Sequence, residues 1–457
     1  MLVPVVSAAE GAESVSRQAV AGPVLLHFAS VENASDEEKL STQVASTWAV
    51  ATKSATDDTV FALLHGGLDV AILDCTESAD SAEPRVANSA EAGITRNRLG
   101  YAVQADNSND ASHEKIIVLL QQLAPLCSVV LLQMGLAAAQ GLTKEQARAL
   151  VKAAGGDATT VALCVTPLSD VHVDPCGLSA KRVAQLHAFG VHVVGLPASP
   201  LPAARGHDTP APEATEITVG EKLDVAHTFA LCARSDRTDG LIPTVVTDEY
   251  ERALGLVYSS RQSLVFAITE GRGIYYSRSR ASLWRKGDTS GMWQALLSIR
   301  LDCDSDAVLF QVQQFGDPPA FCHKFTRSCW GDSAGIPGLE RTLWSRKADA
   351  PAGSYTKRLF DDRELLRHKL LEEVQEQHEA LQEGDKDHLA AETADVLYFA
   401  MVAAAAGGVK LRDVEAHLDR RALHIKRRKG DAKAHRIAAA EAALADAPAA
   451  AAASSGK

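Results

Sequence analysis

The chain has 457 residues, of which 46% are hydrophobic and 23% charged, and its formal net charge is −12. At roughly 100–200 residues per domain, this length predicts two to four domains. The negative charge argues against nucleic acid or an anionic membrane as the main partner. The N-terminus has no basic segment before its apolar residues, and the longest late apolar run is too short to cross a bilayer, so we expect a cytoplasmic protein.

Residues 1–200 alternate short apolar runs with helix-like stretches. The apolar runs predict strands at residues 24–28, 70–75, 129–134, 161–165 and 191–196. Between them, TKEQARALVKAAGG and SAKRVAQLHAFG have the spacing of amphipathic helices. This order predicts a βα-repeat domain with a parallel sheet. We find no glycine-rich nucleotide-binding motif here, so we predict a degenerate domain of unknown function, either a scaffold or a decayed enzyme.

The sequence pattern of the remaining chain changes twice, first to closely spaced strand-like runs and then to helical spacing. Residues 201–235 are predicted to be a linker and lead-in, because the stretch 197–215 contains five prolines. Five closely spaced strand-like runs and one helical insert, SLVFAITEG, predict a β-rich domain over 236–345. Residues 355–430 have helical spacing, in three long segments of which the first two end at glycine. The tail 431–457 is alanine-rich and is predicted to be disordered or loosely helical.

An acidic stretch, DCDSD, contains three aspartates at alternate positions, Asp302, Asp304 and Asp306. If this stretch is extended, the three carboxylates point to one face and Cys303 to the other. Their mutual repulsion becomes favourable when a hard cation such as Mg²⁺ accepts their oxygens. The alternative for this pattern alone is an acidic, solvated strand edge.

The cysteines fall into two groups. Cys322 and Cys329 follow Cys303 closely, and three thiolates suit Zn²⁺ with a fourth position left for water, whose pKa zinc lowers to about 7. His323, next to Cys322, is a candidate general base or ligand, with a structural role as the alternative. The others are predicted to be reduced and buried: Cys75, Cys127, Cys164, Cys176 and Cys232.

A basic segment, YYSRSRASLWRKGDTSG, precedes the aspartates. Its arginine forks and hydroxyls in a glycine-containing loop suit a phosphate, and its tryptophan could pack against a purine. The alternative is a basic surface loop. The candidate substrate-binding residues are Arg278, Arg280, Trp284, Lys286, Thr289 and Ser290.

Together, YYSRSR–LW–KG–TSG, DCDxD and the CH…SC pair closely resemble phosphoribosyl-AMP cyclohydrolase over about 236–335. The resemblance implies hydrolytic opening of the adenine ring of phosphoribosyl-AMP between N1 and C6. It implies zinc on Cys303, Cys322 and Cys329, and magnesium on the three aspartates. It also implies a homodimer that shares the zinc site between subunits. The family usually has asparagine where this chain has Met292.

Acidic residues also gather on two of the predicted helices. In KLLEEVQE, three glutamates lie three or four residues apart and share a broad helix face, and the next helix has ExAD. Two facing acidic helices could hold Mg²⁺ against a triphosphate and orient water. The alternative is a solvated acidic face. The candidate ligands are Glu372, Glu373, Glu376, Glu392 and Asp395.

KxxEExxE, ExAD and DVExxL resemble phosphoribosyl-ATP pyrophosphohydrolase, an all-helical domain of the MazG type, over about 356–430. The order of the two domains is similar to the front part of the fungal trifunctional histidine biosynthesis protein. Because the chain ends at Lys457, we expect its histidinol dehydrogenase part to be absent. The predicted fold class is therefore multidomain: α/β, then mainly β, then all α.

The resemblance implies a bifunctional hydrolase with Zn²⁺ and Mg²⁺ as cofactors. It would convert phosphoribosyl-ATP to phosphoribosyl-AMP and pyrophosphate, and then open the ring of the product. Two alternatives remain at this point. One is a non-catalytic dimeric scaffold, and the other is a protein in which only the helical domain is active, as a general nucleotide pyrophosphatase.

Overall fold

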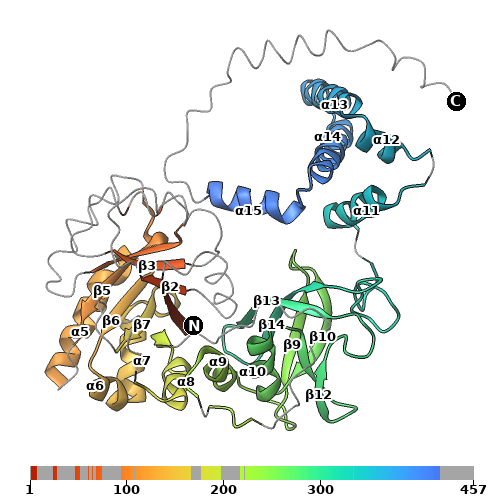
Figure 1. Ribbon diagram of the computed structural model, residues 1–457. Helices are drawn as coiled ribbons and strands as arrows, with labels where there is room; N and C mark the ends of the chain where they lie inside the picture. The colour runs from red at the N-terminus through yellow and green to blue at the C-terminus, as the bar shows by residue number, and fades with distance from the viewer. Residues whose placement is uncertain are drawn as a thin grey trace. The chain divides into compact units, whose positions relative to one another are not determined.

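The computed structural model (Figure 1) describes much of the 457-residue chain. The described residues are 2–7, 24–27, 47–51, 60, 64, 68–74, 94–105, 110–165, 177–196, 217–220, 222–332, 334–351 and 353–422. The chain divides into two compact units at Gly331–Asp332. The proline-rich stretch 197–215 and the tail 431–457, both subjects of predictions, lie outside the described residues.

The first part of unit 1 is a closed barrel of eight parallel strands. Neighbours in sequence pair with one another, and β8 pairs with β1 to close the ring. The strands are β1 (Leu2–Ser7), β2 (Val24–His27), β3 (Thr47–Ala51), β4 (Val70–Asp74), β5 (Leu99–Gln104), β6 (Val129–Gln133), β7 (Thr160–Cys164) and β8 (His192–Leu196). The predicted parallel sheet is confirmed, and three of its strands, β1, β3 and β5, were not predicted.

Alternation along the strands gives this barrel two apolar layers. Ile72, Leu131 and Ala162 belong to an inner cluster, whereas their neighbours Leu73 and Leu132 belong to the outer core. The outer layer is covered by α5 (Asp110–Leu123), α6 (Leu136–Gly141), α7 (Lys144–Ala153) and α8 (Ala180–Ala188). Because successive strand side chains point to opposite faces, both faces must be apolar when helices surround a filled barrel.

A short helix, α9 (Val225–Cys232), continues the barrel core into the next part of unit 1. It begins at Asp224, whose carboxylate accepts a hydrogen bond from the His227 amide at 2.8 Å. It packs against α8 on one side and α10 (Arg261–Glu270) on the other. The segment predicted as linker and lead-in over 201–235 therefore includes a packed helix, seven of whose eight residues are buried.

The β-rich part of unit 1 contains a four-stranded sheet in the order β10–β9–β14–β13 and a separate hairpin of β11 and β12. The predicted strands and the helical insert, α10, are confirmed, whereas β12 was not predicted. The strands are β9 (Ile242–Thr247), β10 (Ala253–Ser259), β11 (Ile274–Ser277), β12 (Ser282–Arg285), β13 (Gln294–Leu301) and β14 (Val308–Gln314).

Unit 2 is helical. Its elements are α11 (Ile336–Ala348), α12 (Tyr355–Asp361), α13 (Arg363–Glu383), α14 (Lys386–Ala406) and α15 (Leu411–Ala422). The three long helical segments predicted here correspond to α13, α14 and α15. A small core joins α11, α12, α13 and α14 through Leu343, Leu359, Leu366, Phe399, Val402 and Ala405.

Two features of unit 2 differ from expectation. Helix α11 packs with α12 and α14, so the boundary between the parts lies near Gly331 and not between residues 345 and 355. Helix α14 is long and apolar enough, by length and composition only, to cross a membrane. The same helix carries the charged residues Glu392 and Asp395 and contributes Phe399 to the small core.

The bridging helix provides a test of this architecture. Phe229 is only 3% exposed within α9, so Phe229→Ala should lower the free energy of unfolding of unit 1 by about 3–5 kcal/mol. Denaturant unfolding would measure the loss, and hydrogen exchange in α13 should be unchanged. Val245→Ala, at a site that is 38% exposed, is the control and should cost much less. An equal effect of both variants would contradict a buried bridging role for α9.

Candidate metal and substrate sites

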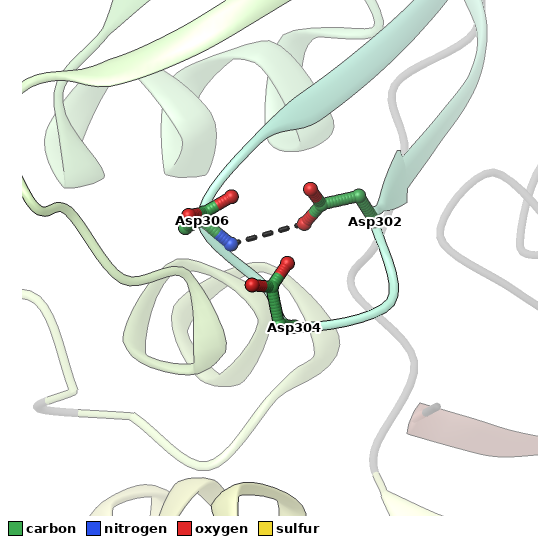
Figure 2. Close-up of side chains that lie close together, drawn as sticks. All are labelled: Asp302, Asp304 and Asp306. Carbon is green, nitrogen blue, oxygen red and sulfur yellow. Dashed lines mark hydrogen bonds between the residues drawn. The ribbon is translucent and has the colours of Figure 1, made fainter. Parts of the chain in front are cut away.

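The three aspartates lie in the turn that joins β13 to β14. Asp302, Asp304 and Asp306 offer carboxylate oxygens that all lie within 4.8 Å of one another (Figure 2). The Asp302 Oδ1 atom accepts hydrogen bonds from the amides of Asp306 at 3.0 Å and Ala307 at 3.1 Å. The turn thus folds back on the first carboxylate and brings the other two beside it.

The extended conformation considered for this stretch is wrong. Strand β13 ends at Leu301, and Ser305 has a φ of +67°, which interrupts any strand alternation. Cys303 does not lie on an opposite face from the carboxylates, since its Sγ atom is 3.9 Å from Asp304 Oδ1. The carboxylates nevertheless converge, because a tight turn brings alternate residues together as effectively as a strand face does.

Repulsion within this turn affects the pKa of one of its carboxyl groups. Asp304 foremost, then burial and Asp302, raise the pKa of Asp306 above its ordinary value. Three clustered carboxylates suit a hard divalent cation with oxygen ligands. The donor set therefore fits magnesium.

A second loop brings two cysteines together. Phe325 donates its amide to the Cys322 carbonyl at 3.0 Å, and the Cys329 amide donates to Leu254 of β10 at 2.8 Å. Hydrogen bonds from the Lys324 amide and the Thr326 hydroxyl lower the pKa of Cys322. Burial, followed by the neighbouring Cys322, raises the pKa of Cys329. Cys322 is thus the more acidic thiol of this pair.

The third cysteine stands apart. Among the described residues, the only groups of three or more potential ligands with all atoms within 4.8 Å are carboxylate clusters, so Cys303, Cys322 and Cys329 do not form such a group in one chain. Cys303 is exposed, as is His323, whose Nδ1 atom lies 3.9 Å from Cys322 Sγ. The structure brings together two of the three predicted zinc ligands.

Lys286 occupies a different place from the phosphate contact expected for it. It is 4% exposed, and its Nζ donates to the carbonyls of Met292 at 3.0 Å and Ala320 at 3.2 Å. Burial lowers the pKa of Lys286, against the opposing effect of Cys322 and Cys329. The lysine therefore ties the loop that ends at Met292 to the segment that leads into Cys322.

The loop between Lys286 and Met292, which carries the hydroxyl groups of Thr289 and Ser290, is tightly constrained. Gly287 has a φ of +95°, and a Cβ atom there would lie 2.4 Å from the Trp293 Cα atom, so only glycine fits. Asp288 pairs with the buried Arg272 at 3.0 Å, a contact that the sequence did not suggest. Thr289 and Ser290 are exposed at the tip of this loop, where a phosphate could reach them.

The other basic and aromatic candidates lie on the β11–β12 hairpin. The Arg278 guanidinium stacks 4.0 Å above the ring of Tyr258, while Arg280 is exposed and donates to Ser277. Trp284 packs against Tyr275 with ring centroids 5.7 Å apart, and it is partly buried against the core. The Trp284 ring is therefore already packed against other protein side chains, whereas Arg278 and Arg280 are accessible to a ligand.

The helical unit contains the second carboxylate cluster. Glu373 and Glu376 of α13 and Glu392 of α14 have oxygens that all lie within 4.8 Å of one another. Burial, followed by Glu373, Glu372 and Glu392, raises the pKa of Glu376. Glu392 Oε2 is buried and has no hydrogen-bond partner. A buried, unpaired carboxylate oxygen in a cluster of carboxylates is the arrangement that a divalent cation would complete.

Two further predicted ligands lie outside this group. Glu372 pairs with Lys369 at 2.9 Å, and the same lysine pairs with Glu373 at 2.8 Å. Burial alone would lower the pKa of Lys369, but the hydrogen bonds to both glutamates outweigh it and raise the pKa overall. Asp395 is exposed and does not belong to the cluster. Lys369 therefore partly neutralises one side of the acidic site.

A histidine that the sequence reasoning missed supports this cluster. His388 contacts Glu392 Oε1 through Nε2 at 3.3 Å and Glu383 Oε2 through Nδ1 at 2.9 Å. The hydrogen bond to Glu383 is the main reason why the pKa of His388 is raised. Its spacing of four residues from Glu392 was the available signal, since residues i and i+4 meet on a helix surface.

Comparison with known families separates the two sites into two domains. Residues 255–331 match the phosphoribosyl-AMP cyclohydrolase family and contain the aspartate turn and all three cysteines. Residues 336–422 match the phosphoribosyl-ATP pyrophosphohydrolase family and contain the glutamate cluster. The fold and sites therefore define a protein with two hydrolase-type domains in series.

One relative is matched over most of its own length. A histidine biosynthesis bifunctional protein HisIE of Parasynechococcus marenigrum is 36% identical over 195 residues, which are 38% of this chain and 86% of that protein. The chain belongs to this family of histidine biosynthesis proteins.

Histidine biosynthesis trifunctional proteins of two fungi are also similar. The Kluyveromyces lactis protein is 53% identical over 201 residues, and the Neurospora crassa protein is 39% identical over 328 residues. These matches cover 44% and 71% of this chain, but only 25% and 36% of the fungal proteins.

The position of Lys286 leads to a prediction that separates two roles. Lys286→Met should leave the carbonyls of Met292 and Ala320 unpaired in the interior and cost about 1–3 kcal/mol of unfolding free energy for each lost partner. Denaturant unfolding would measure this loss. Arg280→Met, at an exposed position on the neighbouring hairpin, is the control and should leave stability unchanged. A Lys286→Met variant of wild-type stability that only binds substrate more weakly would restore the phosphate-binding role.

Proposed function

We propose that this protein is a bifunctional hydrolase of histidine biosynthesis. The helical unit would cleave phosphoribosyl-ATP to phosphoribosyl-AMP and pyrophosphate, and the β-rich part of unit 1 would then open the adenine ring between N1 and C6. The observation that carries the proposal is that each family match contains its own cluster of converging carboxylates. We place both reactions in the cytoplasm, with small phosphorylated substrates and no nucleic-acid or membrane partner.

In the helical unit, Glu373, Glu376 and Glu392 are the residues that would hold Mg²⁺. When bound, magnesium would neutralise the charge of the triphosphate and of the departing pyrophosphate. Lys369 keeps Glu372 and Glu373 in place through paired hydrogen bonds, and His388 does the same for Glu392. Water adds to the phosphorus that remains with the nucleotide, and the phosphoanhydride bond to pyrophosphate breaks.

In the cyclohydrolase part, Cys322 and Cys329 would hold Zn²⁺, with Cys303 as the third ligand, and the three aspartates would hold Mg²⁺. Zinc, when bound, would lower the pKa of water and supply a nucleophile at neutral pH. Water adds to C6, the C6–N1 bond breaks, and N1 takes a proton. His323, whose Nδ1 atom lies 3.9 Å from Cys322 Sγ, would take or give that proton as a general acid–base.

We propose that the zinc site is completed by a second copy of the chain. The support is twofold. Cys303 stands apart from the cysteine pair in one chain, and two large aromatic side chains beside the pair are exposed, Phe325 by 63% and Trp330 by 69%. Exposed aromatic residues of this kind are typical of interfaces between proteins. A homodimer with twofold symmetry would bring each Cys303 to the other subunit's pair.

Separate sites predict separable activities. Cys322→Ser should remove bound zinc and lower the rate of ring opening by about 100-fold or more, while the rate of pyrophosphate release stays unchanged. Glu373→Gln should lower the rate of pyrophosphate release by about 100-fold or more, while the rate of ring opening stays unchanged. Pyrophosphate and ring-opened product are measured separately, the latter from phosphoribosyl-AMP as substrate.

The matched controls are Cys127→Ser, where a hydroxyl can replace the thiol that donates to Leu123, and Glu379→Gln on the exposed face of α13. Both should retain both activities. If wild-type protein binds no zinc and forms neither product, the scaffold alternative would be correct. Pyrophosphate release that does not favour phosphoribosyl-ATP over ordinary triphosphates would favour a general pyrophosphatase.

A shared zinc site predicts complementation between inactive subunits. Cys303→Ser and Cys322→Ser proteins should each lack ring opening. After unfolding and refolding as an equal mixture, half of the twofold dimers are mixed, and one of the two sites in each is intact, so about a quarter of the wild-type activity should return. The same mixture of Cys303→Ser with Cys303→Ala is the control and should stay inactive. No recovery in a mixture that forms dimers would place all three ligands in one chain.

A further inference from the structure

The N-terminal barrel touches the aspartate turn directly. His187 lies in the last turn of the barrel helix α8, and its Nε2 atom is 3.2 Å from the hydroxyl oxygen of Ser305. Ser305 stands between Asp304 and Asp306, so a residue of the barrel contacts the segment that presents the carboxylates. The two partners are 118 positions apart in the sequence.

Ser305 is the residue of the turn that is contacted by His187 and Arg234, which lie outside the turn. Its carbonyl accepts a hydrogen bond from the Arg234 amide, just beyond α9, at 2.7 Å, and its own amide donates to the Asp302 carbonyl at 3.3 Å. It is 7% exposed, although Asp302 and Asp304, which precede it in the turn, are exposed. Its positive φ of +67° is a conformation that a non-glycine residue adopts only when its surroundings hold it there.

The turn needs such a hold because of what it carries. Three carboxylates within 4.8 Å repel one another, and this repulsion favours an open loop when no cation is bound. The internal hydrogen bonds to Asp302 from the Asp306 amide (Figure 2) and from the Ala307 amide oppose the opening. Contacts on the outer side of the turn, at Ser305, add to these without occupying any carboxylate oxygen.

His187 is itself firmly placed. Helix α8 begins at Ser179, whose hydroxyl accepts the Arg182 amide at 3.2 Å, and it packs against the buried helix α9. The His187 ring meets the ring of His192 edge-on, with centroids 5.6 Å apart, and His192 is the first residue of β8. The contact with Ser305 therefore comes from the end of the barrel at which the strands begin, whereas catalysis in barrels of this kind takes place at the opposite end.

We propose that the N-terminal barrel is a support that keeps the aspartate turn in its cation-binding form, with His187 as a positioning residue that acts through Ser305. The proposal rests on the cyclohydrolase function proposed above for this turn. It also gives the barrel a role that needs no active site of its own. The Parasynechococcus marenigrum relative matches 38% of this chain with 86% of its own length. The rest of that relative is too short to form such a barrel, so that protein would hold its turn without this support.

Hydrogen exchange in the metal-free, full-length protein tests the proposal without relying on activity. In His187→Ala, the amides of Asp306 and Ala307 should exchange about three- to tenfold faster, which is the effect of losing one partly buried hydrogen bond. Ser305→Ala should give a similar increase, and the double variant should add little to either single variant, because both remove the same contact. Exchange in the strands of the barrel should be unchanged.

Magnesium dependence gives a readout that a general loss of stability would not produce. In His187→Ala, the Mg²⁺ concentration for half-maximal ring opening of phosphoribosyl-AMP should rise about three- to tenfold. The Mg²⁺ dependence of pyrophosphate release, which takes place in the other unit, should not change. His187→Gln places an amide nitrogen near the former Nε2 atom and should restore both exchange and Mg²⁺ dependence.

Lys181→Ala, at an exposed position on the same helix, is the matched control and should behave as the wild type in both measurements. Unchanged exchange and unchanged Mg²⁺ dependence in His187→Ala would overturn the support. So would faster exchange spread evenly over unit 1, since that indicates a structural role alone. If the wild-type protein opens no ring, the proposed function fails, but the exchange experiment still decides whether the barrel holds the turn.

Discussion

Electrostatic repulsion between carboxylates is the constraint on which both sites of this protein depend. Each site gathers three acidic side chains within 4.8 Å, and an isolated peptide would not hold them so close. The chain meets this requirement in two ways. In the helical unit, two long helices supply the rigidity, and Lys369 and His388 supply hydrogen-bonded partners. In the aspartate turn, backbone amides bond to Asp302, and neighbouring elements hold Ser305.

These two solutions differ in where their stability originates. A helical hairpin is built from local contacts, so Glu373 and Glu376 are placed by the helix period itself. A six-residue turn has little intrinsic stability, because fixing its backbone costs conformational entropy that few contacts offset. Its geometry must come from elements distant in sequence. Helix α9 and the end of α8 are such elements, and both belong to segments for which the sequence suggested no role.

The elements that could be predicted from the sequence follow the same division between local and distant contacts. Five strands of the β-rich part, helix α10 and the helices α13, α14 and α15 were predicted from their local pattern, whereas β12, α11 and α12 were not. Barrel closure was not predicted, because the pairing of β8 with β1 joins the two ends of the domain and leaves no local signal. Helix α9 was not predicted, because it is buried on almost every side, and such a segment has little amphipathic period by which to identify it.

The candidate sites show the same limit at the level of single residues. Carboxylate and thiol motifs pointed to the regions in which the structure gathers carboxylates and two of the thiols, but residue type alone did not separate candidate ligands from the residues that support them. Lys286 looks like a phosphate ligand in a basic segment, yet it bonds to two backbone carbonyls in the interior. Ser305 looks like a spacer between two aspartates, yet it is the buried residue of the turn. In each case the deciding partner is more than five positions away, or in another element. A motif therefore specifies which atoms are available for chemistry, whereas the surrounding fold determines which of them remain free to perform it.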